Sequence, residues 1–164
     1  MDLYLDKDLI SVSPQRRPDP AVIREAAEEY YRSGQYYCSE AIVKTINDEF
    51  GLGYPDEIVR LASGFPIGIG GAGCSCGAVT GGVMAIGMVF GRTKPRDPSV
   101  KRCLALSREL HDRFTERHGC TCCRSLIRGM ILKSPEHLQK CVTLTGEVAE
   151  ETAKILTREL NRIA

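Results

Sequence analysis

The sequence lacks an excess of charge of either sign and a long hydrophobic run. Its 22 lysines and arginines against 21 aspartates and glutamates give a net charge of +1, with a pI of about 7.5. Nucleic acids and anionic membranes attract proteins through a strong basic field, so we expect neither as a partner. The longest apolar stretch, residues 77–90, is shorter than the roughly 20 residues that span a bilayer. We therefore expect no membrane segment.

Signals for export, sheets and common enzyme classes are also missing. Residues 1–8 carry aspartates where a secretion signal has a basic start and an apolar stretch, so we expect a cytoplasmic protein. Apolar residues do not alternate at period two, and no Ser-His-Asp or H-E-x-x-H arrangement occurs. The glycine-rich segment 64–73 lacks the Lys-Ser/Thr ending of a phosphate-binding loop and follows no predicted strand. Nucleotide binding is therefore not expected.

What the sequence does contain is a strong helical pattern. A chain of 164 residues with 43% hydrophobic and 26% charged residues fits one globular domain, which we place at 19–164 after an N-terminal tail at 1–18. Helix starts are marked by the pairs Asp19-Pro20, Asp97-Pro98 and Ser134-Pro135. The pattern predicts helices over 20–33, 39–50, 55–62, 76–90, 98–118 and about 120–129, then a capped turn over 134–141 and a final helix.

The predicted helix over 76–90 is apolar on every side, so we expect it at the centre of the fold. Gly77, Gly81 and Ala85 are small residues at four-residue spacing, which lets another helix or a bound group approach the backbone. The predicted fold is an all-α, single-domain, multi-helix bundle around this buried, small-residue-rich central helix. Small-residue helices also build subunit interfaces, so a homodimer is expected.

The chain has eight cysteines, and they cluster. Cytosolic thiols stay reduced, so close-spaced cysteines there indicate metal ligands or a redox couple rather than structural bridges. Cys38, Cys76 and Cys123 fall at predicted helix starts, where free N–H groups and the helix dipole favour the thiolate. Cys141 falls in the connection to the last helix. We predict that these four sulfurs meet at one pocket.

The glycine-rich segment allows two interpretations. It is either a tight connection into the buried helix, or a nest of N–H groups that faces an anionic cluster or ligand. On the second interpretation the backbone at the site comes from Gly70, Gly71, Gly73 and Gly77.

The order of these elements resembles the C_GCAxxG_C_C family of redox-active proteins over about residues 20–160. The matching segments are Tyr37-Cys38-Ser39-Glu40-Ala41, Cys76-Gly77-Ala78-Val79-Thr80-Gly81, Cys123-Arg124-Ser125-Leu126 and Cys141. The resemblance implies four functional cysteines in a small helical protein with a redox role but no defined substrate. The pattern is also similar to part of the split-Soret cytochromes, which carry haem and an iron–sulfur cluster.

A covalent haem needs C-x-x-C-H, and the single C-x-x-C here, Cys120 to Cys123, is followed by Arg124. Covalent haem is therefore not expected, whereas four cysteines suffice for an iron–sulfur cluster. Extra cysteines leave the ligand assignment open, because Cys74 could replace Cys76 and Cys122 could replace Cys123. Cys103 belongs to an apolar helical stripe and is expected in the core.

Several chemistries remain open from the residues alone. The cysteines bind an iron–sulfur cluster, or they form a dithiol/disulfide couple from Cys120 with Cys123 or Cys74 with Cys76. A non-catalytic zinc module is the alternative from another class, and a transient metal-handling site is a third. In the redox readings the partner is an electron donor or acceptor protein that the sequence does not identify. His111 and His137 are expected to be structural, and His118, close to Cys120, is left undecided.

Overall fold

The computed structural model describes residues 14–163, and within them the chain is all-α, as predicted. The described residues form no strand, only an isolated β-bridge between Ser75 and Cys122. The helices are α1 (Pro20–Arg32), α2 (Cys38–Phe50), the 3-10 helix η2 (Asp56–Ala62), α3 (Gly77–Phe90), α4 (Val100–His118), α5 (Cys123–Leu126) and α6 (Pro135–Ile163).

Local signals fix where the helices begin. Asp19 Oδ1 accepts the N–H of Ala21 at 2.9 Å ahead of Pro20, and Ser134 Oγ accepts the N–H of His137 at 3.2 Å ahead of Pro135. These contacts satisfy N–H groups that have no partner within the helix. At Asp97 the carboxylate instead caps a turn, through Ser99 N–H at 2.9 Å, and α4 begins only at Val100.

Two boundaries near the C-terminus differ from the prediction. The expected turn over 134–141 and the final helix are one continuous helix, α6, so Cys141 lies inside a helix rather than in a connection. Gly146 lies inside α6 where α1 approaches closely, and the carboxylate side chain of Glu28 on α1 occupies the space that a Cβ would take. The helix expected over about 120–129 is shorter, ending at Leu126 ahead of a turn in which Gly129 has a positive φ of 82°.

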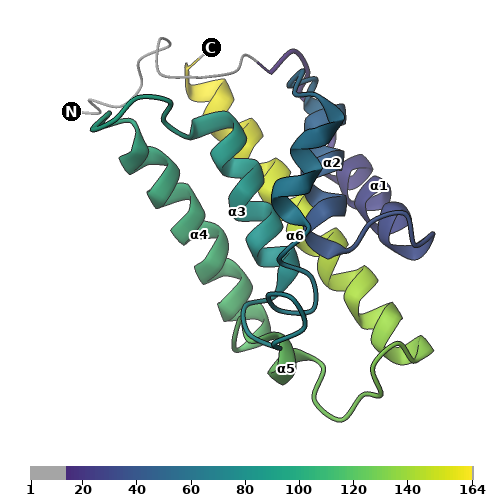
Figure 1. Cartoon of the computed structure of the whole chain (residues 1–164). Helices are drawn as coiled ribbons and strands as arrows, with labels where there is room; N and C mark the ends of the chain where they lie inside the picture. Colours follow the sequence, from purple (N-terminus) through teal and green to yellow (C-terminus); the bar gives the residue numbers. More distant parts are fainter. Residues whose placement is uncertain (1–13, 164) are drawn as a thin grey trace.

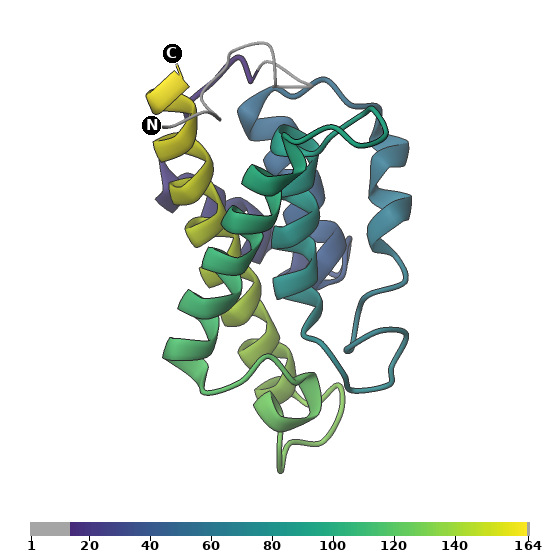
Figure 2. The ribbon, with the colours of Figure 1, turned by 90° about the vertical axis from the view of Figure 1, so that its left-hand side faces the viewer.

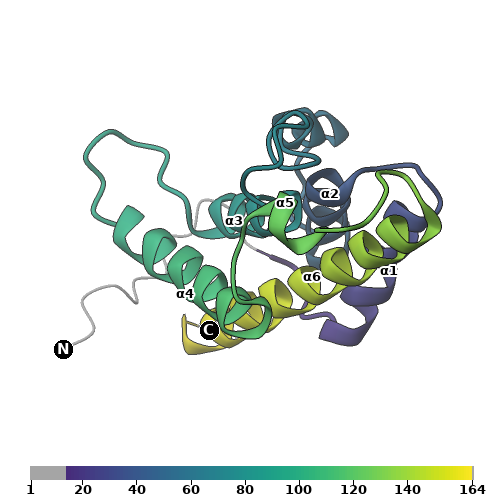
Figure 3. The same cartoon turned by 90° about the horizontal axis from the view of Figure 1, so that it is seen from below.

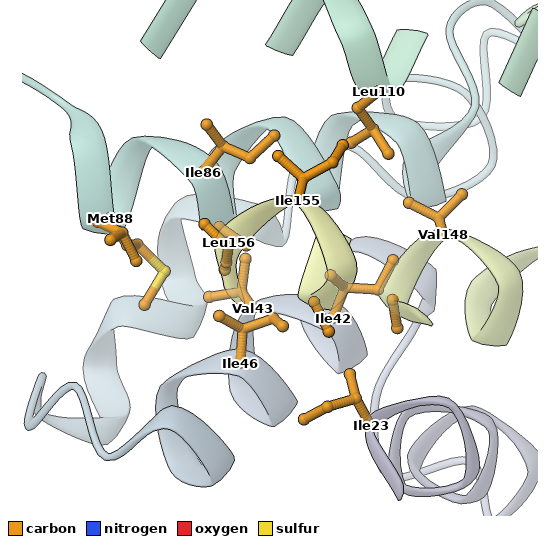
Figure 4. Packing of buried hydrophobic residues seen from close by; sticks show 14 of the residues in the cluster. Ile23, Ile42, Val43, Ile46, Ile86, Met88, Leu110, Val148, Ile155 and Leu156 are labelled. Carbon is orange, nitrogen blue, oxygen red and sulfur yellow. The ribbon is translucent and has the colours of Figure 1, made fainter. Parts of the chain in front are cut away.

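Helix α3 lies at the centre of the bundle, with α2 and α6 on one side and α4 on another (Figure 1). Ten of its 14 residues are buried, which agrees with its all-round apolar sequence. Aliphatic side chains from α1, α2, α3, α4 and α6 interlock beside it (Figure 4). The labelled members of this core are Ile23, Ile42, Val43, Ile46, Ile86, Met88, Leu110, Val148, Ile155 and Leu156.

Small residues on α3 serve the close approach that their spacing predicts. A Cβ on Gly81 would fall 2.7 Å from the Cα atom of Ser39, so α2 crosses α3 backbone to backbone at this point. A Cβ on Gly82 would fall 2.6 Å from a methyl group of Leu110 on α4. The crossing with α2 brings the start of α2 beside the start of α3.

The connections that carry most of the cysteines gather at one end of the bundle. We call this part, residues 33–38, 63–76 and 120–141, the cysteine end; α5 marks it, and the α3–α4 connection and the end of α6 lie at the opposite end (Figures 1 and 2). Seen from below, α5 lies over the ends of α3 and α6, beside the glycine-rich loop (Figure 3). No helix among residues 14–163 is long and apolar enough to cross a membrane.

The expected tail at 1–18 lies largely outside the described residues. In its described part, the N–H groups of Gln15 and Arg16 both donate to the carbonyl of Phe50, at 3.0 and 3.2 Å. Residues 14–18 therefore contact the end of α2.

Candidate cysteine site

Two cysteine-rich segments from distant parts of the sequence lie antiparallel at the cysteine end. The N–H of Cys76 donates to the carbonyl of Thr121 at 2.7 Å, and the N–H of Cys123 donates to the carbonyl of Cys74. Side chains alternate faces along an extended backbone, so Cys76 and Cys123 lie on the opposite face from Cys122. The pairing turns Cys76 and Cys123 inward, where both are buried.

The glycine-rich loop closes over this pair in a left-handed conformation. Every residue from 67 to 71 has a positive φ, between 55° and 86°, and two of the five are isoleucines. A residue with a Cβ loses roughly 1–2 kcal/mol in this conformation. Gly68 is required, because a Cβ there would fall 2.7 Å from the Cβ of Cys123. The loop thus packs closely against Cys123, and this conformation strains the backbone at Ile67 and Ile69.

The four cysteines of the predicted site line a single pocket. Cys38 comes from the first residue of α2, Cys76 from the residue before α3, Cys123 from α5 and Cys141 from the second turn of α6. The other lining residues are Tyr31, Tyr37, Ile67, Gly77, Ala78, Leu126, Ile127, His137, Leu144 and Thr145. The structure therefore brings together sulfurs that are far apart in the sequence, as the spatial prediction required.

Helix N-termini direct N–H groups at two of the sulfurs. Cys76 accepts hydrogen bonds from the N–H groups of Ala78 and Val79, but burial outweighs them and raises the pKa of its thiol. Burial and the neighbouring Cys76 raise the pKa of Cys38 to about 12, against the N–H groups of Ser39 and Ile67. Both thiols are consequently protonated at neutral pH when nothing else is bound.

The sulfurs also repel one another as thiolates. Burial, followed by repulsion from Cys76 and Cys141, raises the pKa of Cys123 to about 11. No lysine or arginine lines the pocket, and the nearby charge of Lys140 only partly offsets the effect of burial, which still raises the pKa of Cys141. Any state that removes negative charge from the pocket is therefore favoured: protonated thiols, a disulfide, or thiolates bound to a metal centre.

Cys141 differs from the other three pocket cysteines because two side chains, those of His137 and Tyr31, contact its sulfur. His137, one turn earlier on α6 and 4% exposed, places Nε2 at 3.6 Å from Cys141 Sγ. The Tyr31 hydroxyl donates a hydrogen bond to the same sulfur, which partly offsets the effect of burial in raising the pKa of Cys141. Burial raises the pKa of Tyr31 itself, so its hydroxyl keeps its proton.

The remaining cysteines lie outside the pocket. Cys74 is exposed, and Cys120 and Cys122 are partly buried. The pKa of Cys122 is lowered by a hydrogen bond with the Ser125 side chain and by backbone N–H groups. Cys103 packs partly buried against the hydrophobic core, as expected for a structural cysteine.

Of the four glycines predicted at the site, one lines the pocket and three lie outside it. Gly77 lines the pocket, and a Cβ on it would collide with Cys38 Sγ. Gly70 and Gly71 are exposed, and neither they nor Gly73 lines the pocket; the Gly73 carbonyl instead accepts the N–H of Arg124 at 3.0 Å. The loop reaches the site through Ile67 and Gly68.

Sequence reasoning missed two polar members of the pocket, His137 and Tyr31. His137 is expected to be structural because a lone histidine usually is, and the predicted turn over 134–141 does not place it one turn from Cys141 on a single helix. Tyr31 carries no such local signal, since it reaches Cys141 only through the packing of α1 on α6. His118, for which the sequence does not decide, pairs with Glu147 at 2.7 Å and does not line the cysteine pocket.

A family model matches residues 36–155 of the chain, which include all four pocket cysteines and the glycine-rich loop. The family is described as "Putative redox-active protein (C_GCAxxG_C_C)". The chain belongs to this family. No curated protein and no solved structure matches it.

Proposed function

We propose that this member of the C_GCAxxG_C_C family is an electron-transfer protein whose Cys38, Cys76, Cys123 and Cys141 bind an iron–sulfur cluster. The observation that carries the proposal is the convergence of one thiol from each of four separate segments on one pocket. Four thiolates suffice for a [2Fe–2S] or a [4Fe–4S] centre, which takes up and releases one electron at a time when bound.

The donors fit such a group in kind. Iron–sulfur sites combine thiolate ligands with hydrogen bonds to sulfur and apolar walls, and the pocket has N–H donors at Cys38 and Cys76 and side-chain donors at Cys141. The hollow between the side chains has room for about one water molecule. Loading therefore requires the walls to move apart, and Ile67 of the glycine-rich loop is one wall that lies outside the helices.

The segments that carry the thiols favour a cluster over zinc. Zinc ribbons take their ligands from two short C-x-x-C pairs, whereas Cys38 and Cys141 here come singly from separate helices. Among the described residues, no group of three or more His, Cys, Asp or Glu side chains is placed to hold a metal ion, so binding of either a cluster or zinc requires the thiols to rearrange.

The protein's own groups would set the properties of the centre. Leu126, Ile127 and Leu144 keep water away, which strengthens every electrostatic interaction inside. Hydrogen bonds from Ala78, Val79 and His137 to the sulfurs stabilise the more negative, reduced state and so raise the reduction potential.

A dithiol/disulfide couple is the second candidate, favoured by the contrast between inner and outer thiols. The Cys122 thiol, with its lowered pKa, can attack a disulfide of a partner protein, forming a mixed disulfide and releasing one partner thiolate. A second thiol of the cysteine end then attacks Cys122 Sγ and releases the other partner thiolate. We propose a reducing, cytoplasmic setting for either chemistry, with all eight cysteines free.

The deciding experiment is anaerobic purification followed by iron, sulfide and zinc analysis and a visible absorption spectrum. The cluster predicts iron and sulfide in equal amounts with broad visible absorption that dithionite bleaches. Stoichiometric zinc without colour would overturn the proposal in favour of a structural module. A colourless, metal-free protein with one titratable disulfide would replace the cluster with the dithiol couple.

Matched cysteine variants locate the centre. Cys76→Ser should abolish the absorption, whereas Cys103→Ser, outside the pocket, should leave it unchanged. Loss of the signal in both variants would show that the effect is general instability, and circular dichroism of each variant checks this directly.

A further inference from the structure

We propose that the cysteine end is a docking surface for a redox partner protein with an acidic surface; this rests on the proposed redox function of the pocket. The inference comes from three features that coincide at this end of the molecule. They are an excess of basic residues, the absence of carboxylate partners for them, and a concentration of exposed apolar side chains.

The first feature is a local charge that the near-neutral whole chain conceals. Residues 63–76 carry no charged side chain, and residues 119–141 carry Arg124, Arg128, Lys133 and Lys140 against Glu136 alone. These segments thus have a net charge of +3, while the rest of the chain has 18 basic against 20 acidic residues. Two of these cations adjoin pocket cysteines in the chain, because Arg124 follows Cys123 and Lys140 precedes Cys141.

The second feature is that these cations have no carboxylate partner within the described part of the fold, unlike the basic side chains of α1, α4 and α6 that pair with acidic residues. Elsewhere basic side chains bridge helices, as Arg113 does to Glu151 at 2.9 Å and Arg158 to Glu109 at 2.7 Å. Among the described residues, no ion pair involves any member of 119–141. Arg124 donates instead to the carbonyl of Ala72, at 2.8 Å. Their charge is therefore left to act outward.

The third feature is apolar. Most of the large hydrophobic side chains exposed on the described surface belong to the cysteine end, and they are Tyr37, Ile69, Ile131, Leu132 and Leu138. Ile131 is 79% exposed. Apolar side chains rimmed by charge are typical of protein docking sites.

Charge complementarity selects the occupant. A second copy docked through the same face would bring two +3 surfaces together, which like-charge repulsion disfavours. An acidic partner is attracted by the positive charge as it approaches, and its apolar side chains can then contact those exposed at the cysteine end. Docking over α5 would place the redox group of the partner beside the pocket. Transient redox complexes use small, charge-steered interfaces of this kind.

The test measures electron transfer to two small oxidants of opposite charge. Reduced protein is mixed with hexacyanoferrate(III), an anion, and with hexaammineruthenium(III), a cation; each takes one electron from the reduced centre. From about 0.01 M to about 1 M salt the screening length falls from roughly 30 to 3 Å. We expect the anion to react about tenfold more slowly at high salt and the cation to react faster.

Charge reversal distinguishes the local field from the total charge. Arg128→Glu with Lys133→Glu should invert both salt dependences. The control, Lys94→Glu with Arg96→Glu, makes the same change in net charge in the exposed α3–α4 connection at the opposite end and should preserve them. Identical behaviour of the two double variants would overturn the docking surface.

Binding supplies a readout that does not need the redox centre. The probe is an acidic flavodoxin, titrated at low salt, and we expect the Arg128/Lys133 variant, but not the control, to lose at least tenfold in affinity. Binding to phosphatidylserine vesicles without binding to flavodoxin would overturn the proposal in favour of a lipid surface. If neither oxidant takes an electron, the proposed redox function fails, while flavodoxin binding still decides whether the surface recognises an acidic protein.

Discussion

The imidazole of His137 points its Nε2 atom at Cys141 Sγ, 3.6 Å away on the same face of α6. Its other nitrogen, Nδ1, accepts the backbone N–H of Lys133 at 3.2 Å. Neutral His137 therefore carries its proton on Nε2 and acts toward Cys141 as a donor, not as a base. Cys141 is the pocket sulfur whose environment side-chain substitutions can tune without altering a ligand.

Replacing this donor should lower the reduction potential of the centre. His137→Phe removes a hydrogen bond that favours the reduced state, and a net change of about 1 kcal/mol corresponds to roughly 40 mV for one electron. Tyr31→Phe should act in the same direction. Protein-film voltammetry measures the potential, and His111→Phe, on the exposed face of α4, is the matched control. An unchanged potential in both pocket variants would show that neither donor acts on the centre.

A single methyl group should disturb the site through Gly77. Gly77→Ala places a Cβ against Cys38 Sγ and 3.2 Å from the Phe65 carbonyl, so Cys38 has to move out of the pocket. Gly87→Ala on the same helix meets nothing within 4 Å and should raise helix stability by up to about 1 kcal/mol. The visible spectrum and the thermal midpoint of both variants check this. Normal absorption in Gly77→Ala would mean that Cys38 is not a ligand.

The helices could be predicted from sequence wherever the signal is local. Asp19-Pro20 marks the start of α1, and the apolar residues on every side of α3 predict its buried, central position. The single helix α6 could not be predicted in the same way: the Ser134 cap is assigned to a separate turn over 134–141, whereas the helix runs unbroken from Pro135 to Ile163. A local cap signal marks where a helix begins but not how far it continues.

The site also has a part that local sequence signals predict and a part that depends on contacts between distant segments. Cys38 and Cys76 stand at helix starts that the sequence marks, so their exposure to N–H groups was predictable. The choice between Cys122 and Cys123 was not, because it is made by the bridge between Ser75 and Cys122, two residues far apart in the chain. That pairing decides which of two adjacent thiols turns inward.

Thiol alkylation of the metal-free protein should follow an order set by burial and pKa. Cys122, with its lowered pKa, should react first at neutral pH, and Cys38, whose pKa is raised from 9.0 to about 12, should react last. Iodoacetamide labelling with peptide mass spectrometry over pH 7 to 11 gives the order. Labelling of Cys38 before Cys122 in folded protein would contradict the assigned environments.

The same raised pKa values make stability depend on pH. A thiol that holds its proton more tightly when folded stabilises the fold fully below its unfolded pKa, 9.0, and that contribution is lost as pH rises through the folded value. The free energy of unfolding of the metal-free protein should therefore fall between about pH 9 and pH 12. Urea denaturation measures it, and Cys38→Ala should flatten the slope relative to Cys103→Ala.

The two strained isoleucines allow the backbone strain of the glycine-rich loop to be tested separately from its role as a wall of the pocket. Ile67 and Ile69 both have positive φ, but Ile67 lines the pocket while Ile69 is 45% exposed. Replacing either isoleucine by glycine removes backbone strain of roughly 1–2 kcal/mol from the folded state. Glycine also lowers stability by about 0.5–1 kcal/mol, because the unfolded chain gains conformational freedom. Ile69→Gly should therefore leave stability unchanged or slightly higher, with normal absorption. Ile67→Gly gains the same relief but removes a wall of the pocket, so its absorption should bleach faster in air. Equal bleaching rates would show that the left-handed loop serves only to connect η2 to α3.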